Sequence, residues 1–395
     1  MKKPLDGILV LEVGQALAGP YIGTLLGDLG AEVIHIERPG IGDLARYWIP
    51  IRGDLGFYFA VINRNKKSMT LNLRSDRGLE IFLKLAERAD VIIENFVPGV
   101  VKKLGVDYES VKKVNPNIIY CHVSGFGQDG PYRDRPAFDQ VLQGETGIIS
   151  YTGTKEQPCK VNVPITDIIA SLYGTYAVLA ALLHREKTGE GMEIDISLFD
   201  CAVTLMMNLM NMVLVEGFDD KDLRMGFKYF LATPYEPYLA KDGKYVNIVV
   251  ATEWHWKAFC KAVGLEEIMD DPRFATNQAR LKNRSELDKI IEEKMKEKTR
   301  DEWIEILLKA GVPCGAVNTI REVIEHPQTK HRGVIVDVEY PGLDKIKLFR
   351  NPVKFSTFQT GVSRPPKLGE HTEEILKKLG YSDLEIEKLK ENKII

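Results

Sequence analysis

The sequence predicts an α/β protein with a doubly wound parallel sheet, followed by a smaller α+β domain. Apolar runs of strand length alternate with segments of helical spacing up to Val123, and such alternation is typical of βαβ units. After Pro234 the pattern changes to a hairpin followed by short helices, which indicates a second domain. The individual segments support both parts of this prediction.

The first βαβ unit consists of a strand at 8–13, a helix at 19–29 and a strand at 32–36. The pattern recurs as a helix at 78–87, a strand at 90–94, a helix at 108–114 and a strand at 118–123. Because strands joined by helical crossovers run parallel in one sheet, we expect a single doubly wound sheet.

Two long apolar helices are expected next, at 167–185 and 198–215. Apolar residues cover most of their circumference, so both are predicted to be core helices. The most apolar stretch, 168–183, is shorter than a membrane span requires and contains Ser171 and Tyr173. We therefore expect a buried helix and no membrane segment.

The predicted second domain opens with a hairpin at 235–250, whose turn falls at Asp242 and Gly243. Helices are expected at 253–263, 286–297 and 300–309, the last two with the capping signals Ser285-x-x-Asp288 and Thr299-x-x-Glu302. Strand-like pieces at 334–340 and 346–349 follow, and the cap Ser382-x-x-Glu385 opens a terminal helix.

Composition excludes several classes of protein. A net charge of −3 argues against broad nucleic-acid binding, and 44% hydrophobic with 28% charged residues is typical of a globular protein. The five cysteines are widely spaced, so we expect a reducing, cytoplasmic setting and no disulfide framework. The closest histidine pair is His326 and His331, across a proline, and no metal site is expected.

The first βα turn does not fit a dinucleotide fingerprint, because Gly14, Gly19 and Gly23 are too far apart for G-x-G-x-x-G. Gly14 and Gly19 instead indicate a shaped turn and close helix packing. Several cationic residues fall where strands are expected to end. Because ligands of open α/β sheets bind at that edge, some of these residues can converge on a phosphorylated ligand. Each of them alone is typical of a solvated surface charge. They are Arg38, Lys66, Lys67, Arg74, Lys102, Lys103, Arg133 and Arg135.

Asp167 is the most informative carboxylate, because it follows Pro164-Ile165-Thr166 directly before the long apolar helix. An aspartate at this position commonly satisfies free backbone N–H groups of the helix start. It can alternatively act as a nucleophile that attacks an acyl thioester and forms an enzyme-bound anhydride. Position alone leaves both interpretations open.

Many ordered segments resemble one family. They include PLDGILVLEVGQALAGP, LGAEVIHIERPGIGD, NRNKKSMTLNL, ENFVPGVVKKLGVDY, SGFGQDGPYRDRPAFD, LAALLHREKTGEGMEIDISLFD, GVPCGAVNTIREV and LGEHTEEIL. Together they are similar to the class III coenzyme A transferases of the CaiB/BaiF family, from Pro4 to the C-terminus.

The resemblance implies a Rossmann-like large domain built from both chain ends, a small inserted domain and an interlocked homodimer. The corresponding limits are 1–222 and 326–395 for the large domain and 223–325 for the small one. It also implies that no cofactor is permanently bound and that acyl-CoA and a small carboxylic acid are the substrates.

The catalytic aspartate implied by the resemblance is Asp167. It would take the acyl group from the donor thioester and then carry CoA to the acceptor acid. The implied CoA contacts are Arg38, Leu71, Asn72, Leu73, Arg74, Asn95, Phe96, Val97, Lys103 and Arg135. The substrate pocket is expected at Gln15, Leu17, Trp48 and Phe138.

Departures from the family pattern bear on the alternatives. Residues 227–233 replace the glycine-rich loop of formyl-CoA transferases, so oxalate and formate are not the expected partners. A 2-methylacyl-CoA racemase of the same fold needs a histidine where this chain has Phe138, and phenylalanine cannot exchange a proton. A non-catalytic acyl-CoA-binding protein is the third interpretation.

Overall fold

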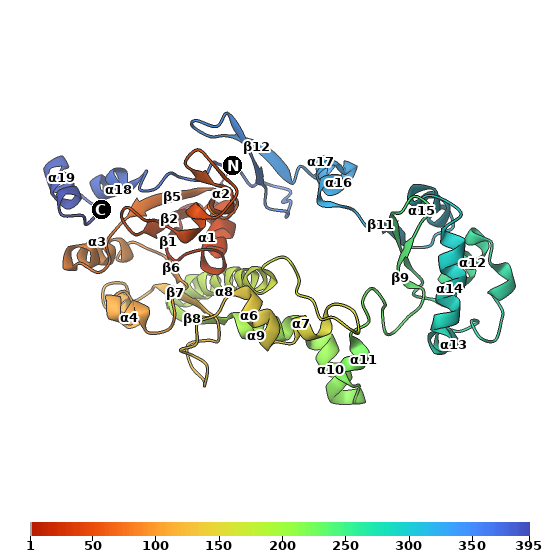
Figure 1. The fold of residues 1–395 in the computed structure, drawn as a ribbon. Helices are drawn as coiled ribbons and strands as arrows, with labels where there is room; N and C mark the ends of the chain where they lie inside the picture. The colour runs from red at the N-terminus through yellow and green to blue at the C-terminus, as the bar shows by residue number, and fades with distance from the viewer. Residues whose placement is uncertain (1) are drawn as a thin grey trace. The chain divides into compact units, whose positions relative to one another are not determined.

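The computed structural model describes residues 2–395, apart from the side chains at 220 and 221. The chain divides into two compact units (Figure 1). The first unit comprises Met1–Thr146, Val161–Met207 and Pro327–Ile395, and the second comprises Gly147–Lys160 and Asn208–His326. The predicted limits 1–222, 223–325 and 326–395 stay predictions.

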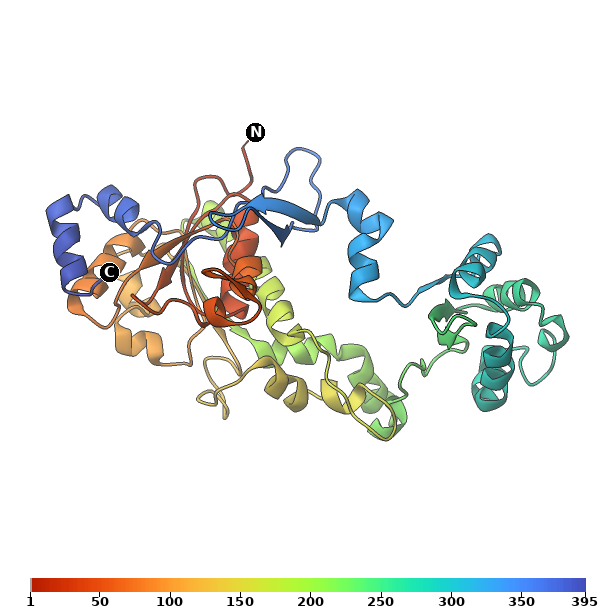
Figure 2. The ribbon, with the colours of Figure 1, turned by 45° about the horizontal axis from the view of Figure 1, so that its top comes forward.

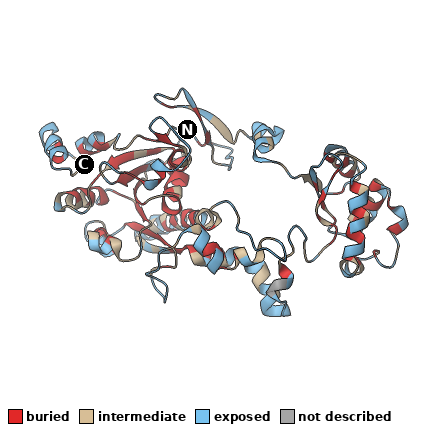
Figure 3. Ribbon diagram, in the orientation of Figure 1, coloured by how far each residue is buried: buried red, intermediate tan, exposed pale blue. Residues whose placement is uncertain are grey.

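A six-stranded parallel sheet forms the centre of the first unit, which confirms the predicted α/β class. Its strand order is β5 (Lys66–Thr70), β2 (Glu32–Glu37), β1 (Leu9–Val13), β6 (Val91–Glu94), β7 (Ile119–Ser124) and β8 (Met192–Ser197). The inner strands are buried along almost their whole length (Figure 3). Burial on both faces explains why they are continuous apolar runs in the sequence.

Helices cover both faces of the sheet. One face packs on α1 (Ala18–Asp28), α6 (Asp139–Glu145), α8 (Ile165–Thr188) and α9 (Leu198–Leu205). The other packs on α3 (Asp76–Ala86), α4 (Val100–Leu104), α5 (Tyr108–Lys112), α18 (Thr372–Lys378) and α19 (Asp383–Glu391). The remaining elements of this unit are η1 (Leu44–Tyr47), β3 (Ile51–Arg52), β4 (Leu55–Gly56), α2 (Phe57–Ile62), α17 (Pro327–Arg332), β12 (Ile335–Glu339) and β13 (Lys345–Phe349).

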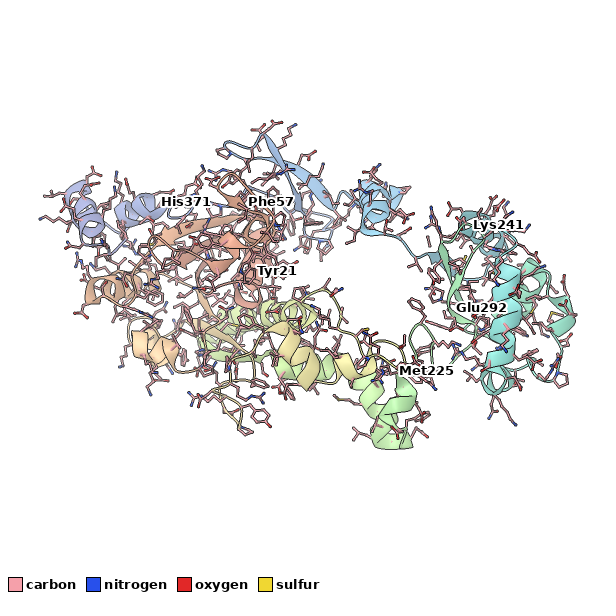
Figure 4. The ribbon with its side chains drawn as sticks, in the orientation of Figure 1. Tyr21, Phe57, Met225, Lys241, Glu292 and His371 are labelled. Carbon is pink, nitrogen blue, oxygen red and sulfur yellow. The ribbon has the colours of Figure 1, made fainter. Side chains whose placement is uncertain are left out.

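The C-terminal segment returns to the edge of the sheet formed by the N-terminal part (Figure 2). The His371 amide donates to the Ser68 carbonyl over 2.9 Å, and the Asn72 amide donates to the Ile394 carbonyl over 2.7 Å. His371, labelled in Figure 4, also accepts the Ser68 amide at Nδ1. Both ends of the chain therefore build this unit.

One described helix, α8, is long and apolar enough to cross a membrane, which corrects the expectation that the stretch is too short. Its buried residues Ala170, Val178 and Ala181 pack in the core of the sheet face. A core helix of a soluble protein passes the same test of length and composition, so α8 is weak evidence for a membrane span.

The second unit contains a three-stranded sheet of β9 (Tyr235–Leu239), β10 (Tyr245–Val249) and β11 (Cys314–Ala316). Its core includes the fully buried Trp256 and Trp303. Its helices are α7 (Ile148–Tyr151), α10 (Met207–Glu216), α11 (Asp220–Leu223), α12 (Glu253–Val263), η2 (Glu266–Ile268), α13 (Asn277–Lys282), α14 (Arg284–Met295), α15 (Arg300–Lys309) and α16 (Ile320–Glu325).

Three local expectations were wrong. The helix expected at 198–215 breaks at Met206 into α9 and α10, which are bent by 65°. No residue of α10 is buried, so α10 is not a core helix. Ser285 lies inside α14 and does not cap it, whereas the capping box of Thr299 and Glu302 is confirmed.

Candidate active site

A cavity of about 220 Å³ lies at the carboxyl ends of β1, β2 and β6. Six predicted CoA contacts and one predicted substrate-pocket residue line it. They are Arg38, Leu71, Asn72, Leu73, Arg74, Phe96 and Gln15. Ligands of open α/β sheets bind at this edge because the strands end there and their loops diverge.

Asn95 shapes the wall of this cavity. Its side chain makes two hydrogen bonds with the Gln15 backbone, of 2.9 Å from the amide and 2.8 Å to the carbonyl. A Cβ atom on Gly14 would lie 2.6 Å from the Asn95 Oδ1 atom, and one on Gly19 would lie 3.1 Å from the Asn95 Cβ atom. The turn and helix start therefore need these glycines for close approach, as the sequence predicts.

A neighbouring hollow of about 470 Å³ shares Leu73, Arg74, Val100 and Leu104 with the first cavity. Lys103 lines this hollow together with Arg74 and Asp76, so two cationic residues and one acidic residue border it. Two cations at such a surface suit a phosphate group.

Val97 and Arg135 line neither of these cavities. Val97 is exposed, and Arg135 pairs with Glu145 over 2.7 Å and stacks on Phe126 and Tyr132. The structure therefore does not bring these two predicted contacts to the cavity.

Lys66, one of the cations expected at the strand ends, is fully buried. Its ammonium group lies 2.8 Å from Glu12 Oε2, so Lys66 is not available to a ligand.

Asp167 lies in the first turn of α8 and is half-buried. Burial raises the pKa of its carboxyl group, the nearby Asp139 raises it further, and the local backbone hydrogen bond only partly opposes them, so the pKa is about 7. The Ser171 hydroxyl donates to the carbonyls of Asp167 and Ala18, each over 2.8 Å. This contact joins the start of α8 to the start of α1, which follows the cavity-lining Gly14 and Gln15 in the chain, although neither Asp167 nor Ala18 lines the cavity.

Asp139 fixes the start of α8 from outside the helix. Its Oδ1 atom accepts hydrogen bonds of 3.0 Å from both the amide and the hydroxyl of Thr166. The Gln143 amide group donates to Asp139 Oδ2 over 2.7 Å and also holds the Val161 carbonyl. Because Pro164 at the N-cap has no side-chain acceptor, Asp139 accepts from the helix start, which is the role that the first of the two interpretations gave to Asp167.

Tyr58 was missed by the sequence analysis. Burial raises the pKa of its hydroxyl group to about 12, with further contributions from the negative charges of Asp167, Asp139 and Asp43. The Tyr58 hydroxyl therefore stays protonated at neutral pH and can donate a hydrogen bond near Asp167. No local sequence pattern marks Tyr58, because helix α2 is far from α8 along the chain.

The predicted substrate-pocket residues other than Gln15 lie around Tyr58 and Asp139. The Trp48 ring contacts the Tyr58 ring edge-on at 4.9 Å, and Leu17 is buried in an apolar cluster against which Tyr58 packs. Tyr21 of α1 and Ile168 of α8 pack on the same cluster, and Figure 4 labels Tyr21. Phe138 is 72% exposed and immediately precedes Asp139.

The second unit has a larger cavity, of about 1040 Å³, and none of the predicted site residues lines it. Met225, Tyr238, Arg284 and Asp288 are among its lining residues, together with Glu292 (Figure 4). Among the described residues there is also no group of three histidine, cysteine or acidic side chains that can hold a metal ion.

The fold and the cleft first define a class: an α/β enzyme whose ligand binds where parallel strands end. The family model described as CoA-transferase family III matches residues 5–372. The chain therefore belongs to CoA-transferase family III, and it is a CoA-transferase.

Named relatives and a solved structure agree with the family assignment. The chain is 36% identical over 391 residues to human "Succinyl-CoA:glutarate CoA-transferase", covering 98% of this chain and 89% of that protein. It is 36% identical to "Succinate--glutarate CoA-transferase" of Agrobacterium fabrum, covering 96% of each. A CAIB/BAIF family protein from Brucella suis matches with a TM-score of 0.87 and 39% identity, covering 96% of this chain and 100% of that one.

Proposed function

We propose that this CoA-transferase moves coenzyme A from an acyl-CoA donor to a free carboxylic acid through covalent intermediates on Asp167. The observation that carries the proposal is the position of Asp167, half-buried in the first turn of α8, a helix whose start the Ser171 hydroxyl ties to the Ala18 carbonyl at the beginning of α1. A carboxylate with a raised pKa is a stronger nucleophile once ionised, and a pKa of about 7 leaves much of it ionised at neutral pH.

In the first half-reaction the Asp167 carboxylate attacks the carbonyl carbon of the donor thioester. The carbon–sulfur bond breaks, the electron pair leaves on the CoA thiolate, and an acyl–aspartyl anhydride forms. The thiolate then attacks the aspartyl carbonyl, which releases the donor acid and leaves an aspartyl-CoA thioester. The second half-reaction runs these steps in reverse with the acceptor. The acceptor carboxylate attacks the aspartyl-CoA thioester, the released CoA thiolate attacks the acceptor carbonyl of the resulting anhydride, and the new acyl-CoA leaves as the Asp167 carboxylate is restored.

The other proposed roles follow from the cavity. Arg38 and Arg74, with Lys103 in the adjoining hollow, supply positive charge for the phosphates of coenzyme A. Leu71 and Leu73 supply apolar wall, and Asn95 supports the turn at Gln15. The Tyr58 hydroxyl, which stays protonated near the charge of Asp167, would donate a hydrogen bond to an oxygen of the reacting acyl group.

We propose a short dicarboxylic acid as donor or acceptor, because the names of several relatives contain succinate, glutarate, mesaconate or citramalate. A panel of these acids, with acetate and oxalate added, tests this choice. The chain is mixed with succinyl-CoA and each acid in turn, and new thioesters are separated by liquid chromatography. A preference for acetate or oxalate over every longer dicarboxylate would contradict the proposed substrate class.

Asp167→Asn tests the nucleophile. The amide is nearly the same size but is a poor nucleophile, so transfer should fall by about a thousandfold or more, whereas CoA affinity should stay close to that of the unchanged protein. Asp134→Asn is the matched control, because Asp134 is exposed and lies outside the cavities described above. Transfer by Asp167→Asn within tenfold of the Asp134→Asn rate would refute the proposed role.

A further inference from the structure

A cluster of ionisable side chains is buried beneath the wall of the cavity. Glu12 lies on β1, His35 and Glu37 lie on β2, and Lys66 lies on β5; all of them are at most 5% exposed. Asp43, in the loop after β2, is 1% exposed. Burying a charged side chain costs free energy unless an opposite charge and hydrogen bonds compensate for it. Each member of this cluster therefore needs a partner.

Two ion pairs in this cluster are complete in themselves. The Lys66 ammonium group donates to both Glu12 carboxylate oxygens, to the Pro20 carbonyl and to the Asn63 side chain, over 2.6 to 3.0 Å. The Arg46 guanidinium makes two hydrogen bonds of 2.7 Å to the Glu37 carboxylate.

Glu37 also accepts from its neighbours. The Ser68 hydroxyl and the Asp43 amide donate to it over 2.5 Å and 2.9 Å. Every polar group of these two pairs is therefore well supplied with partners that do not involve the His35 ring.

His35 stands between the two pairs. Its Nδ1 atom lies 2.6 Å from Glu12 Oε1, and its Nε2 atom lies 3.5 Å from Asp43 Oδ2 and 3.9 Å from Glu37 Oε2. Neither ring nitrogen has the alignment of a good hydrogen bond, so attraction between charges dominates these contacts.

The charges of the cluster balance only with a protonated His35. Three carboxylates, Glu12, Glu37 and Asp43, face two other cations, Lys66 and Arg46. Burial acts to lower the pKa of His35, but the nearby carboxylates of Glu37, Glu12 and Asp43 outweigh it and raise the pKa to about 9. Arg64, two residues before Lys66, is paired with Asp28 and so does not balance these carboxylates.

Asp43 connects this cluster to the cavity. Its carboxylate accepts the Ala16 amide at 3.0 and 3.2 Å and the Ala45 amide at 2.8 Å. Ala16 has φ of +65°, a left-handed conformation that is strained for a residue other than glycine. Both Asp43 and Gln15 line the cavity, so the Asp43 carboxylate holds a strained turn in its wall.

We propose that His35 is a positioning residue for coenzyme A, which fixes Asp43 and thereby the turn of Gln15 to Leu17 at the cavity. His35 does not line the cavity, so it acts through Asp43 and touches no substrate. Without a positive charge here, Asp43 faces Glu12 and Glu37 unscreened, and it moves or takes up a proton. This role of His35 rests on the proposed CoA site.

The test compares His35→Gln with His35→Lys. Glutamine removes the charge and lysine restores it, so His35→Gln should weaken binding of free CoA about tenfold and His35→Lys should recover most of the loss, both read by titration calorimetry. The KM for acyl-CoA should rise with the dissociation constant while kcat changes little. A His35→Gln affinity within twofold of the unchanged protein, or no recovery with lysine, would overturn the proposal.

Arg185→Gln is the control for a purely structural effect. It breaks the 2.7 Å ion pair with Asp90, whose carboxylate accepts the amide of Leu9 at the opposite end of β1. It should lower the melting temperature and leave CoA affinity unchanged. If Arg185→Gln weakens CoA binding as much as His35→Gln does, the effect is general loss of stability and the positioning role fails.

If His35→Gln does not fold, the pH dependence of CoA affinity in the unchanged protein tests the proposal instead. CoA affinity should fall as the pH rises through about 9, where His35 loses its proton, and His35→Lys should lack this step. The same step in both proteins would contradict the proposal. Absence of CoA binding by the unchanged protein at pH 7 would instead remove the proposed function itself, so the two failures are distinguishable.

Discussion

At the scale of single residues, the negative charge of Asp139 adds to the effect of burial in raising the pKa of Asp167, the proposed nucleophile. Asp139→Asn keeps an acceptor for the Thr166 amide but removes the negative charge that raises the pKa of Asp167. The acidic limb of the pH profile of kcat should therefore move to lower pH. Transfer rates measured from pH 5 to 9 check this, and a limb that stays in place or moves to higher pH contradicts it.

Asp167 should also reduce the stability of the fold when it is ionised. Its pKa of about 7 in the folded chain lies above the value of about 3.9 expected in the unfolded chain, so stability is lost as the pH rises between the two values. Asp167→Asn should then be more stable than the unchanged protein at pH 8, by about 1 to 3 kcal/mol, and much less so at pH 5. Urea unfolding at both pH values measures the difference, and an equal effect at pH 5 and pH 8 would refute this origin.

Sequence alone could place Asp167 near a helix start, because a proline and an apolar helix flank it. It could not find Tyr58, Asp139 or His35 as members of the site. Tyr58 on α2 and Asp139 on α6 lie near the start of α8, and His35 on β2 lies near Asp43, which holds the turn after β1. Residues so far apart in the sequence meet only once the sheet is assembled. The catalytic and binding roles stay predictions.

At the scale of elements, the packing of α1 on β1 depends on Gly23. A Cβ atom there would lie 1.9 Å from Glu12 Oε2, whose carboxylate is held by Lys66. Gly23→Ala should therefore lower the free energy of unfolding by about 1 to 3 kcal/mol, despite the better helix propensity of alanine. Gly315→Ala is the control, because a Cβ atom there meets no atom within 4 Å, and equal melting temperatures for the two variants would contradict the packing argument.

Strongly patterned elements could be predicted and weakly patterned ones could not. The inner strands are continuous apolar runs, whereas β5 (KKSMT) and β8 (MEIDIS) at the two edges of the sheet have no such run and were missed. The break at Met206 was missed because the apolar run continues through Leu205, Met206 and Met207 with no proline or glycine to mark an end. Helix α10 was expected to be buried because its composition is apolar, but none of its residues is buried in this chain.

At the scale of the whole molecule, we propose that the protein is a homodimer. Helix α10 exposes Met207, Leu214 and Val215 at 63%, 79% and 74%, and an apolar surface of this kind commonly meets a partner. Replacing both Leu214 and Val215 by glutamate should convert the protein from two subunits to one, as measured by light scattering after gel filtration. Leu384→Glu, at a position of α19 that is 67% exposed, is the control and should leave the mass unchanged. A single subunit in the unchanged protein would contradict the proposal.

The fold class followed from local patterns because parallel sheets impose long apolar runs and regular crossovers. The domain limits stay predictions, and the second compact unit also takes in the short segment Gly147–Lys160 from far upstream, which no local pattern connects to the residues after Asn208. The resemblance to the family was confirmed over residues 5–372, whereas the identity of the acids depends on side chains brought together from distant segments.

Trapping of the covalent intermediate tests the central claim most directly. The protein is incubated with succinyl-CoA and hydroxylamine, digested and analysed by mass spectrometry. If Asp167 carries the acyl group and then CoA, hydroxylamine should convert this side chain alone to a hydroxamate, and only when the thioester is present. An unmodified Asp167 in a preparation that still turns over acyl-CoA, or a hydroxamate at another carboxyl group, would contradict the account.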